Sequence, residues 1–265
     1  FLQVNATVKP GVDPSVVEKR LDAIIADYLN NGPTADEIQR AATSEVADQL
    51  RSIEKVGGFG GQAGALAQGR LFTGDSDYYR RSLRRYASAT PQAVRAALQK
   101  WMGRPALTIV LEPGERPPYA ESKVVAARGK AGDIKVASVK RDVPPSGPAP
   151  ALDFPAVQHV RLANGIAVDY AQRTAAPLTQ VALVFDAGFA ADQPTQRGLQ
   201  NMTVPLLDEG AAGLSAQQIA EAKERLGASI GAAGGPDRTT VTLSALSANL
   251  APSLGLVRDI VQRPD

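Results

Sequence analysis

The chain has 265 residues, of which 44% are hydrophobic, and its formal net charge is +2. This length predicts one large or two medium domains, and the small charge excludes a general attraction to nucleic acid or to an anionic membrane. No apolar run is long enough to span a membrane. Cysteine is absent and His159 is the single histidine, which excludes disulfides, thiolate nucleophiles and cysteine-based metal sites.

The first segment begins and ends with strand signals. Residues 1–8 alternate between apolar and polar side chains, which is typical of a half-buried strand. The apolar run 106–111 predicts a buried strand. We expect these two strands to pair in one sheet that carries helices on a face.

Helical periodicity fills the sequence between these two strands. The expected helices are 15–30, 34–55, 75–85 and 90–101. Three of them follow recognisable start signals, namely Asp13 before Pro14, Thr34 with Glu37 three residues later, and Thr90 before Pro91. These signals make the helical starts the best-defined boundaries of this segment.

Two stretches of the first segment invite a binding interpretation. The glycine-rich run 57–70 lacks both phosphate-binding glycine patterns, so we interpret it as a flexible joint before a small-residue helix. A cluster of basic residues follows, without the interleaved aromatic residues of a nucleic-acid site, and predicts a solvated helix face. Its members are Arg80, Arg81, Arg84 and Arg85.

Residues 113–155 are rich in proline and poor in long apolar runs, which is typical of a linker. After it, Asn164-Gly165 between two alternating runs predicts a hairpin within residues 157–173. A Ser-His-Asp triad would have to use His159 from this hairpin. Nothing nearby in sequence completes a triad or a metal site, which favours a surface or packing role for His159.

The rest of the second segment predicts strands and helices in turn. The expected elements are a strand at 179–187, helices at 198–210 and 215–226, strands at 228–233 and 238–246, and a helix at 250–262. In the helix at 198–210, we expect an apolar face to point toward a core and Gly210 to end the helix. That face consists of Leu199, Met202, Leu206 and Leu207. Both segments therefore predict the α+β class.

Two regions together resemble the insulinase/pitrilysin family of zinc metallopeptidases, which includes processing peptidases. The second region has LANGIAV, VALVFDAGFAADQPTQRGLQNM, LDEGA and ERLGASIGAAGGPDRTTVTLSALSANL in the order of that family's N-terminal repeat. The first has VNATVKPGVD, NGPTADEIQRA and ATPQAVRAALQKW followed by LTIVLEP, which look like the end of the second repeat.

The resemblance implies lobes of two layers, sheet plus helices, of the processing-peptidase/insulinase type. It implies an internal fragment, with residues 1–112 ending the second lobe of a catalytic half and cut at the N-terminus. Residues 113–155 are the linker, and residues 156–265 are the first lobe of an inactive half, cut at the C-terminus.

The family's active lobe carries H-x-x-E-H on a helix, where two histidines bind zinc and the glutamate is the general base. The resemblance places these three positions at Asn201, Val204 and Pro205, whose side chains cannot serve in those roles. We therefore expect a degenerate motif, with no catalytic and no metal-binding residue in this chain. Zinc is expected in the catalytic lobe of the parent protein.

The expected function is the non-catalytic part of a zinc-dependent endopeptidase acting on peptides or unfolded chains, which closes the chamber and holds substrate. The alternatives are a non-catalytic binding or scaffold subunit of the same fold, or the partner subunit of a separate active chain. Expected partners are peptide substrates and the remaining lobes or a second subunit. Family resemblance and the lack of cysteine point to the periplasm.

Overall fold

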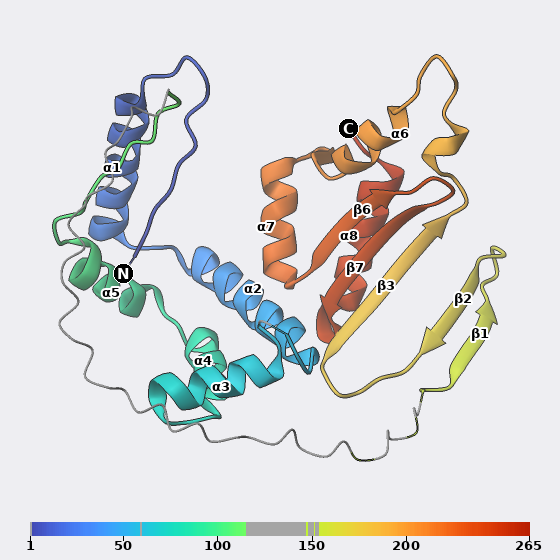
Figure 1. Ribbon diagram of the computed structural model, residues 1–265, viewed down its shortest axis with the longest axis horizontal. Coiled ribbons are helices and arrows are strands. Elements are labelled where there is room, and N and C mark those ends of the chain that lie inside the picture. Colours follow the sequence, from blue (N-terminus) through green and yellow to red (C-terminus); the bar gives the residue numbers. More distant parts are fainter. Residues whose placement is uncertain (1, 59, 115–146, 148–150, 152–153) are drawn as a thin grey trace, which may run out of the picture. The chain divides into compact units, whose positions relative to one another are not determined.

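The computed structural model describes residues 2–58, 60–114, 147, 151 and 154–265. They form helices and antiparallel sheets, which confirms the α+β class (Figure 1). The chain divides into two compact units, one made of residues 1–106 with 173–265 and the other of residues 107–172. The predicted linker 113–155 lies largely outside the described residues, and the boundaries at 112 and 156 stay predictions.

The first hundred residues fold into helices, and the predicted start signals are confirmed. Thr34 accepts a hydrogen bond from the backbone N–H of Glu37, whose carboxylate bonds back to the N–H of Thr34, so the capping box is complete. Asp13 and Thr90 cap their helices in the same way as single acceptors. The helices are α1 (Pro14–Asn31), α2 (Ala35–Glu54), α3 (Gln62–Thr73), α4 (Tyr78–Ala87) and α5 (Pro91–Met102).

A hydrogen bond between side chains ties α1 to the start of α2. The Tyr28 hydroxyl donates to Oε1 of Glu37 at 2.6 Å. This bond, with those from Thr34, lowers the pKa of Glu37, and the same bond raises the pKa of Tyr28. The capping carboxylate therefore serves two helices at once.

The strands predicted at 1–8 and 106–111 are wrong. Residues 2–8 and 106–111 have no strand partner, and Leu2, Val4, Leu107 and Ile109 are exposed. A strand exists only where a second backbone completes its hydrogen bonds. The alternating pattern of 2–8 and the apolar run 106–111 indicate only which side chains are apolar. They do not determine whether a second backbone lies alongside.

The unit of residues 107–172 contains the predicted hairpin. Strands β1 (Val157–Arg161) and β2 (Ala167–Ala171) pair antiparallel. The turn between them is closed by the N–H of Gly165 donating to the carbonyl of Leu162 at 2.9 Å. Gly165 has φ +89°, a conformation that glycine adopts without strain, so the Asn-Gly signal is confirmed.

The larger unit contains a sheet of three antiparallel strands in the order β3-β7-β6. The strands are β3 (Leu178–Phe185), β6 (Ser229–Gly234) and β7 (Thr239–Leu246). They match the predicted strands within two residues at each end. Two further short strands, β4 (Gly210–Ala211) and β5 (Leu214–Ser215), form a separate pair.

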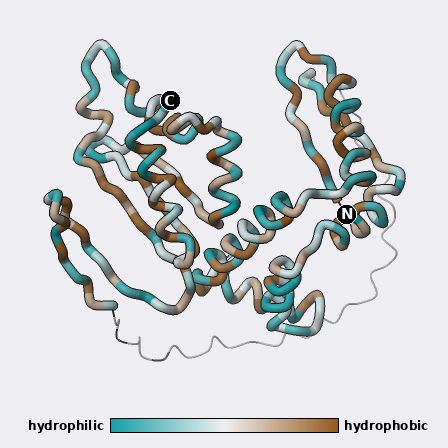
Figure 2. Tube along the Cα trace, turned by 180° about the vertical axis from the view of Figure 1, so that it is seen from behind, coloured by the Kyte–Doolittle hydropathy of each residue, from teal (hydrophilic) through white to brown (hydrophobic). Residues whose placement is uncertain are grey.

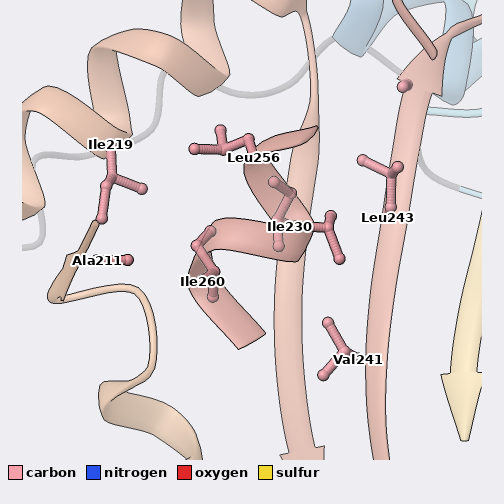
Figure 3. Packing of buried hydrophobic residues seen from close by; sticks show 9 residues of the cluster. Ala211, Ile219, Ile230, Val241, Leu243, Leu256 and Ile260 are labelled. Atoms are coloured by element: carbon pink, nitrogen blue, oxygen red, sulfur yellow. The ribbon is translucent and has the colours of Figure 1, made fainter. Parts of the chain in front are cut away.

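Helices α7 (Ala216–Leu226) and α8 (Leu250–Gln262) bury one face of the sheet (Figure 3). Odd-numbered residues of β7 and even-numbered residues of β6 point to this face, as the two-residue period of a strand requires. Figure 2 colours the chain by hydropathy and shows hydrophobic residues at intervals along both the strands and the helices. The buried core cluster is Ala211, Ile219, Ile230, Val241, Leu243, Ala245, Leu256, Val257 and Ile260.

Capping again sets the helix boundaries in this unit. Ser215 and Gln218 form a capping box at the start of α7, as predicted, and Gly227 in the left-handed region ends the helix. The described residues also contain short 3₁₀ turns, which are η1 (Phe189–Ala191), η2 (Val204–Leu206) and η3 (Ser247–Asn249).

Candidate functional site

The loop before the candidate site is fixed to the turn between β6 and β7. The N–H of Phe189 donates to the carbonyl of Gly235, and the N–H of Ala190 to that of Pro236, both at 3.0 Å. Gly188 lies so close to the carbonyl of Pro236 that a side chain there has no space. The loop therefore enters the site in one defined path.

The helix of the candidate site is shorter than predicted. Helix α6 covers Leu199–Thr203 and then tightens into η2 (Figure 1). Pro205 has no N–H to donate to the carbonyl of Asn201, so the α-helical pattern stops there. The following bonds join residues three apart, as in the N–H of Leu207 to the carbonyl of Val204 at 3.4 Å.

The apolar face predicted for this helix is largely wrong. Leu199, Met202 and Leu206 are 53%, 71% and 58% exposed, respectively. Leu207 packs against the core cluster as predicted, and Val204 is buried with 6% exposure. The break at Pro205 explains the difference, because five residues of α-helix followed by a 3₁₀ turn cannot present one continuous face.

The three motif positions lie on one side of α6 and η2. Asn201 is exposed, and its Oδ1 lies 3.7 Å from the place that a Cβ on Gly234 of β6 would occupy. Val204 is buried beside it, and Pro205 is exposed. The three motif positions therefore supply one neutral amide and two apolar side chains.

These residues do not fit a zinc ion. A zinc site takes imidazole, thiolate or carboxylate ligands, whereas positions 201, 204 and 205 supply an amide, an isopropyl group and a ring without donor or acceptor. Within the described part of the chain, no three His, Asp or Glu side chains come together to hold a metal ion. That no residue of this chain is catalytic stays a prediction.

A polar cluster lies next to the motif positions. Nε2 of Gln200 donates to the carbonyl of Ala187 at 2.8 Å and to Oγ1 of Thr239 at 2.7 Å. The Thr239 hydroxyl in turn donates to the same carbonyl at 2.8 Å. Thr239 is buried, and Oε1 of Gln200 is a buried acceptor without a protein partner among the described residues. The cluster joins α6 to the ends of β3 and β7.

Among the described strands, β6 lies at one edge of its sheet, and α6 contacts it. The N–H of Gly235 donates to the carbonyl of Arg238 at 2.7 Å, which makes 235 and 238 a hydrogen-bonded pair. Such pairs alternate along an antiparallel ladder, so the backbone of Gly231 and Ala233 bonds to β7. The backbone N–H and C=O groups of Ile230, Ala232 and Gly234 point away from the sheet.

This edge lacks the features that usually protect an edge strand. Charged side chains, proline and bulges prevent other chains from pairing with exposed edges. The sequence of β6 is SIGAAG, which contains neither charge nor proline. Within the described residues, no strand pairs with this edge of β6.

The single histidine has a partner that the sequence interpretation missed. Nδ1 of His159 lies 2.7 Å from Oδ1 of Asp169 across the β1–β2 hairpin, and both side chains are mostly exposed. The hairpin register places these residues opposite each other. No serine hydroxyl bonds to the His159 ring within the described residues, and its surface position agrees with the prediction.

The two binding interpretations of the first segment find no support. A groove of about 450 Å³ between α2, α3 and α4 borders the glycine-rich run, but Glu45 and Asp48 line it, and their carboxylates would repel a phosphate. Arg81 pairs with Asp75 at 2.7 Å, and its side chain is 61% exposed. The joint and the solvated helix face are therefore the better interpretations.

The sequence predicted the three motif positions, but neither the role of Gln200 nor the edge position of β6. The composition of SIGAAG was a visible signal for an unprotected strand, although only the sheet order shows that it is an edge. Gln200 had no signal, because its partners Ala187 and Thr239 are distant in sequence.

Among the described helices, none combines the length and the apolarity needed to cross a membrane.

Comparison with known proteins connects this site to one family. The family described as Insulinase (Peptidase family M16) matches residues 168–265. No curated protein matches the chain significantly.

Several solved structures are similar over part of their length. The peptidase M16 inactive domain from Pseudomonas fluorescens is 31% identical over 40% of this chain and 26% of that chain, with a TM-score of 0.38. Pitrilysin is 24% identical over 42% of this chain and 12% of its own, with a TM-score of 0.38. The periplasmic protease PqqL from Escherichia coli is 14% identical over 92% of this chain and 30% of its own, with a TM-score of 0.36.

The chain thus spans less than a third of each of these proteins. Superpositions with such low TM-scores do not by themselves establish a relationship. The assignment rests on the match to residues 168–265, which includes α6, the motif positions and the β6 edge. Over residues 168–265, the chain matches the insulinase family, peptidase family M16.

Proposed function

We propose that this chain is a non-catalytic part of a zinc-dependent endopeptidase, and that it holds extended peptide segments. The observation that supports this proposal is the position of β6 at the edge of its sheet. This edge lies next to Asn201, Val204 and Pro205, which stand at the positions of the zinc-binding motif but are not zinc ligands. A peptide added as a new strand would bond to the outward backbone groups of Ile230, Ala232 and Gly234. Chamber closure by this lobe belongs to the same proposal.

Strand addition suits a protein that must hold many different sequences. The backbone bonds are common to all peptides, whereas side-chain pockets provide selectivity. In β6, Ser229, Gly231 and Ala233 alternate with the residues that face the core, and their side chains are small or absent. Affinity from the backbone with little selectivity is what a holding lobe requires.

The purified chain is expected to contain far less than one zinc per molecule and to show no chelator-sensitive peptide cleavage. Elemental analysis and a quenched-fluorescence peptide assay with and without chelator measure both. The matched variant carries Asn201→His, Val204→Glu and Pro205→His, because two histidines four residues apart on a helix bind zinc. This variant should bind more zinc than the natural chain. Stoichiometric zinc in the natural chain would contradict the proposal.

Peptide binding is expected to depend on backbone N–H groups of the peptide. A fluorescein-labelled peptide of alternating valine and serine should bind in fluorescence anisotropy. Methylation of every second nitrogen leaves the N–H groups along one edge of the extended peptide free, so this peptide should still bind. Methylation of every nitrogen removes all N–H groups and should weaken binding by about tenfold or more. Equal binding of the fully methylated peptide would rule out strand addition.

Two proline variants identify the edge that is used. Ala232→Pro removes an outward N–H from β6 while keeping the ladder to β7, and should weaken peptide binding. Ala182→Pro is the matched variant on β3, because by the same alternation Ala182 has its N–H on the side away from β7. It should leave binding unchanged. The opposite result would move the peptide to β3.

A further inference from the structure

Helix α2 packs against a part of the chain that lies far away in sequence. One face of α2 contacts α7 and the end of β7, within the compact unit that joins residues 1–106 to residues 173–265. The contacting residues are spaced three or four apart, so they share one helical face. They are Asp36, Arg40, Thr43, Ala47 and Arg51.

The centre of this contact is apolar and close. Ala47 is completely buried. A Cβ on Gly227 would lie 3.0 Å from Cβ of Ala47 and 3.0 Å from Cδ1 of Leu246. Only a small residue on α2 opposite a glycine at the end of α7 permits this approach.

Arg51 binds the end of α7 and the end of β7 at the same time. Its Nε donates to Oγ of Ser244 at 3.1 Å, and its Nη2 donates to the carbonyl of Ser244 at 3.0 Å and to the carbonyl of Gly227. The carbonyls at the end of a helix carry partial negative charge. A guanidinium group is well suited to bind several such acceptors because its donors are fixed in one plane.

Ion pairs align the other end of the contact. Arg225 donates from Nε and Nη2 to the two carboxylate oxygens of Asp36 at 2.9 and 3.0 Å. Nη1 of Arg40 lies 2.6 Å from Oε2 of Glu224. Hydrogen bonding from Arg225 lowers the pKa of Asp36. Exposed ion pairs add little stability, but the bidentate pair of Arg225 and Asp36 fixes the direction of α2 relative to α7.

We propose that the surface around Gly227, made by Glu224, Arg225, Gly227, Ser244 and Leu246, is a binding site for helix α2. The specificity of this site comes from three parts of α2. Ala47 is buried at the centre of the contact. The ion pairs of Asp36 and Arg40 lie at one end, and the hydrogen bonds of Arg51 lie at the other. The contact holds residues 14–106 to residues 173–265 without help from the covalent path between them. The occupant of this surface is therefore α2 of the same chain.

The test uses the full chain with a site-specific protease sequence inserted between residues 113 and 155. After cleavage, size-exclusion chromatography with light scattering at physiological salt should give one species with the mass of the uncut chain. Two separate species, each with the mass of one piece, would overturn the proposal.

Two lysine variants test the surface itself. Ala47→Lys places a charge in the buried centre and should raise the dissociation constant of the cleaved pieces by about tenfold or more. Ala41→Lys is the matched control, because Ala41 is exposed on the same helix. It should leave the constant unchanged, and circular dichroism should show equal helix content in both. Equal constants for the two lysine variants would overturn the proposal.

Arg51→Gln provides a milder change at the other end of the contact. It keeps a strong helix former on α2 but removes the charge from the bonds to Gly227 and Ser244. The dissociation constant of the cleaved pieces should rise by about threefold or more. An unchanged constant would argue against the assigned role of Arg51.

Discussion

Replacing Ile260 with alanine is expected to lower the free energy of unfolding by about 3 kcal/mol. Ile260 is 1% exposed and is among the largest fully buried side chains of the core that α7 and α8 form on the sheet (Figure 3). The lost apolar contacts and the remaining cavity both contribute to the loss. Urea denaturation followed by circular dichroism measures it.

Leu254→Ala is the matched control for Ile260→Ala. Leu254 lies on the same helix but is 38% exposed. Its side chain therefore buries less apolar surface than that of Ile260, and its truncation leaves no closed cavity. Leu254→Ala should lower the free energy of unfolding by about 1 kcal/mol or less. Equal losses for the two variants would contradict the assignment of α8's buried face.

Gly188→Val is expected to destabilise the unit by about 2–3 kcal/mol. Gly188 presses on the backbone of Pro236 and Asp237, and a backbone neighbour cannot move aside as a flexible side chain can. The substitution should also separate the loop from the β6–β7 turn, since the bonds of Phe189 and Ala190 lie directly next to it. Thermal unfolding of the variant measures the change.

Gly255→Ala is the control for a glycine without such a neighbour. No atom lies within 4 Å of the Cβ position at Gly255, which is inside α8. Alanine there should stabilise the helix by up to about 1 kcal/mol. A Gly188→Val variant as stable as the natural chain would mean that the loop is not held by its contact with Pro236.

Local signals predicted most of the elements because their causes are local. A cap and its helix are neighbours in sequence, so Thr34 with Glu37 and Ser215 with Gln218 could be located directly. The turn at Gly165 depends on one residue that tolerates positive φ. These features need no knowledge of what the rest of the chain does.

Features that depend on distant partners were beyond the sequence. The apolar pattern of residues 106–111 indicates a strand only if another backbone bonds to it, and no such partner is present among the described residues. The contact of Ala47 with Gly227 joins positions on either side of a long intervening segment. Nothing in the local pattern of α2 distinguishes a small residue chosen for contact from one chosen for helix propensity.

The candidate site shows both situations within a few residues. The family resemblance located Asn201, Val204 and Pro205, and the break at Pro205 follows from the chemistry of proline. The apolar residues around it were misjudged because the expected face assumed an unbroken helix. Gln200, whose partners come from β3's end and from β7, could be recognised only in the structure.

The unprotected edge of β6 also carries a risk for the molecule that bears it. Bare backbone groups do not distinguish a peptide from the edge strand of another copy, so the property that permits holding also permits aggregation. A bound peptide would occupy the same groups and block such pairing. In this respect the peptide would act as a protecting ligand for the lobe, and the lobe would be most vulnerable to self-association when it has nothing to hold.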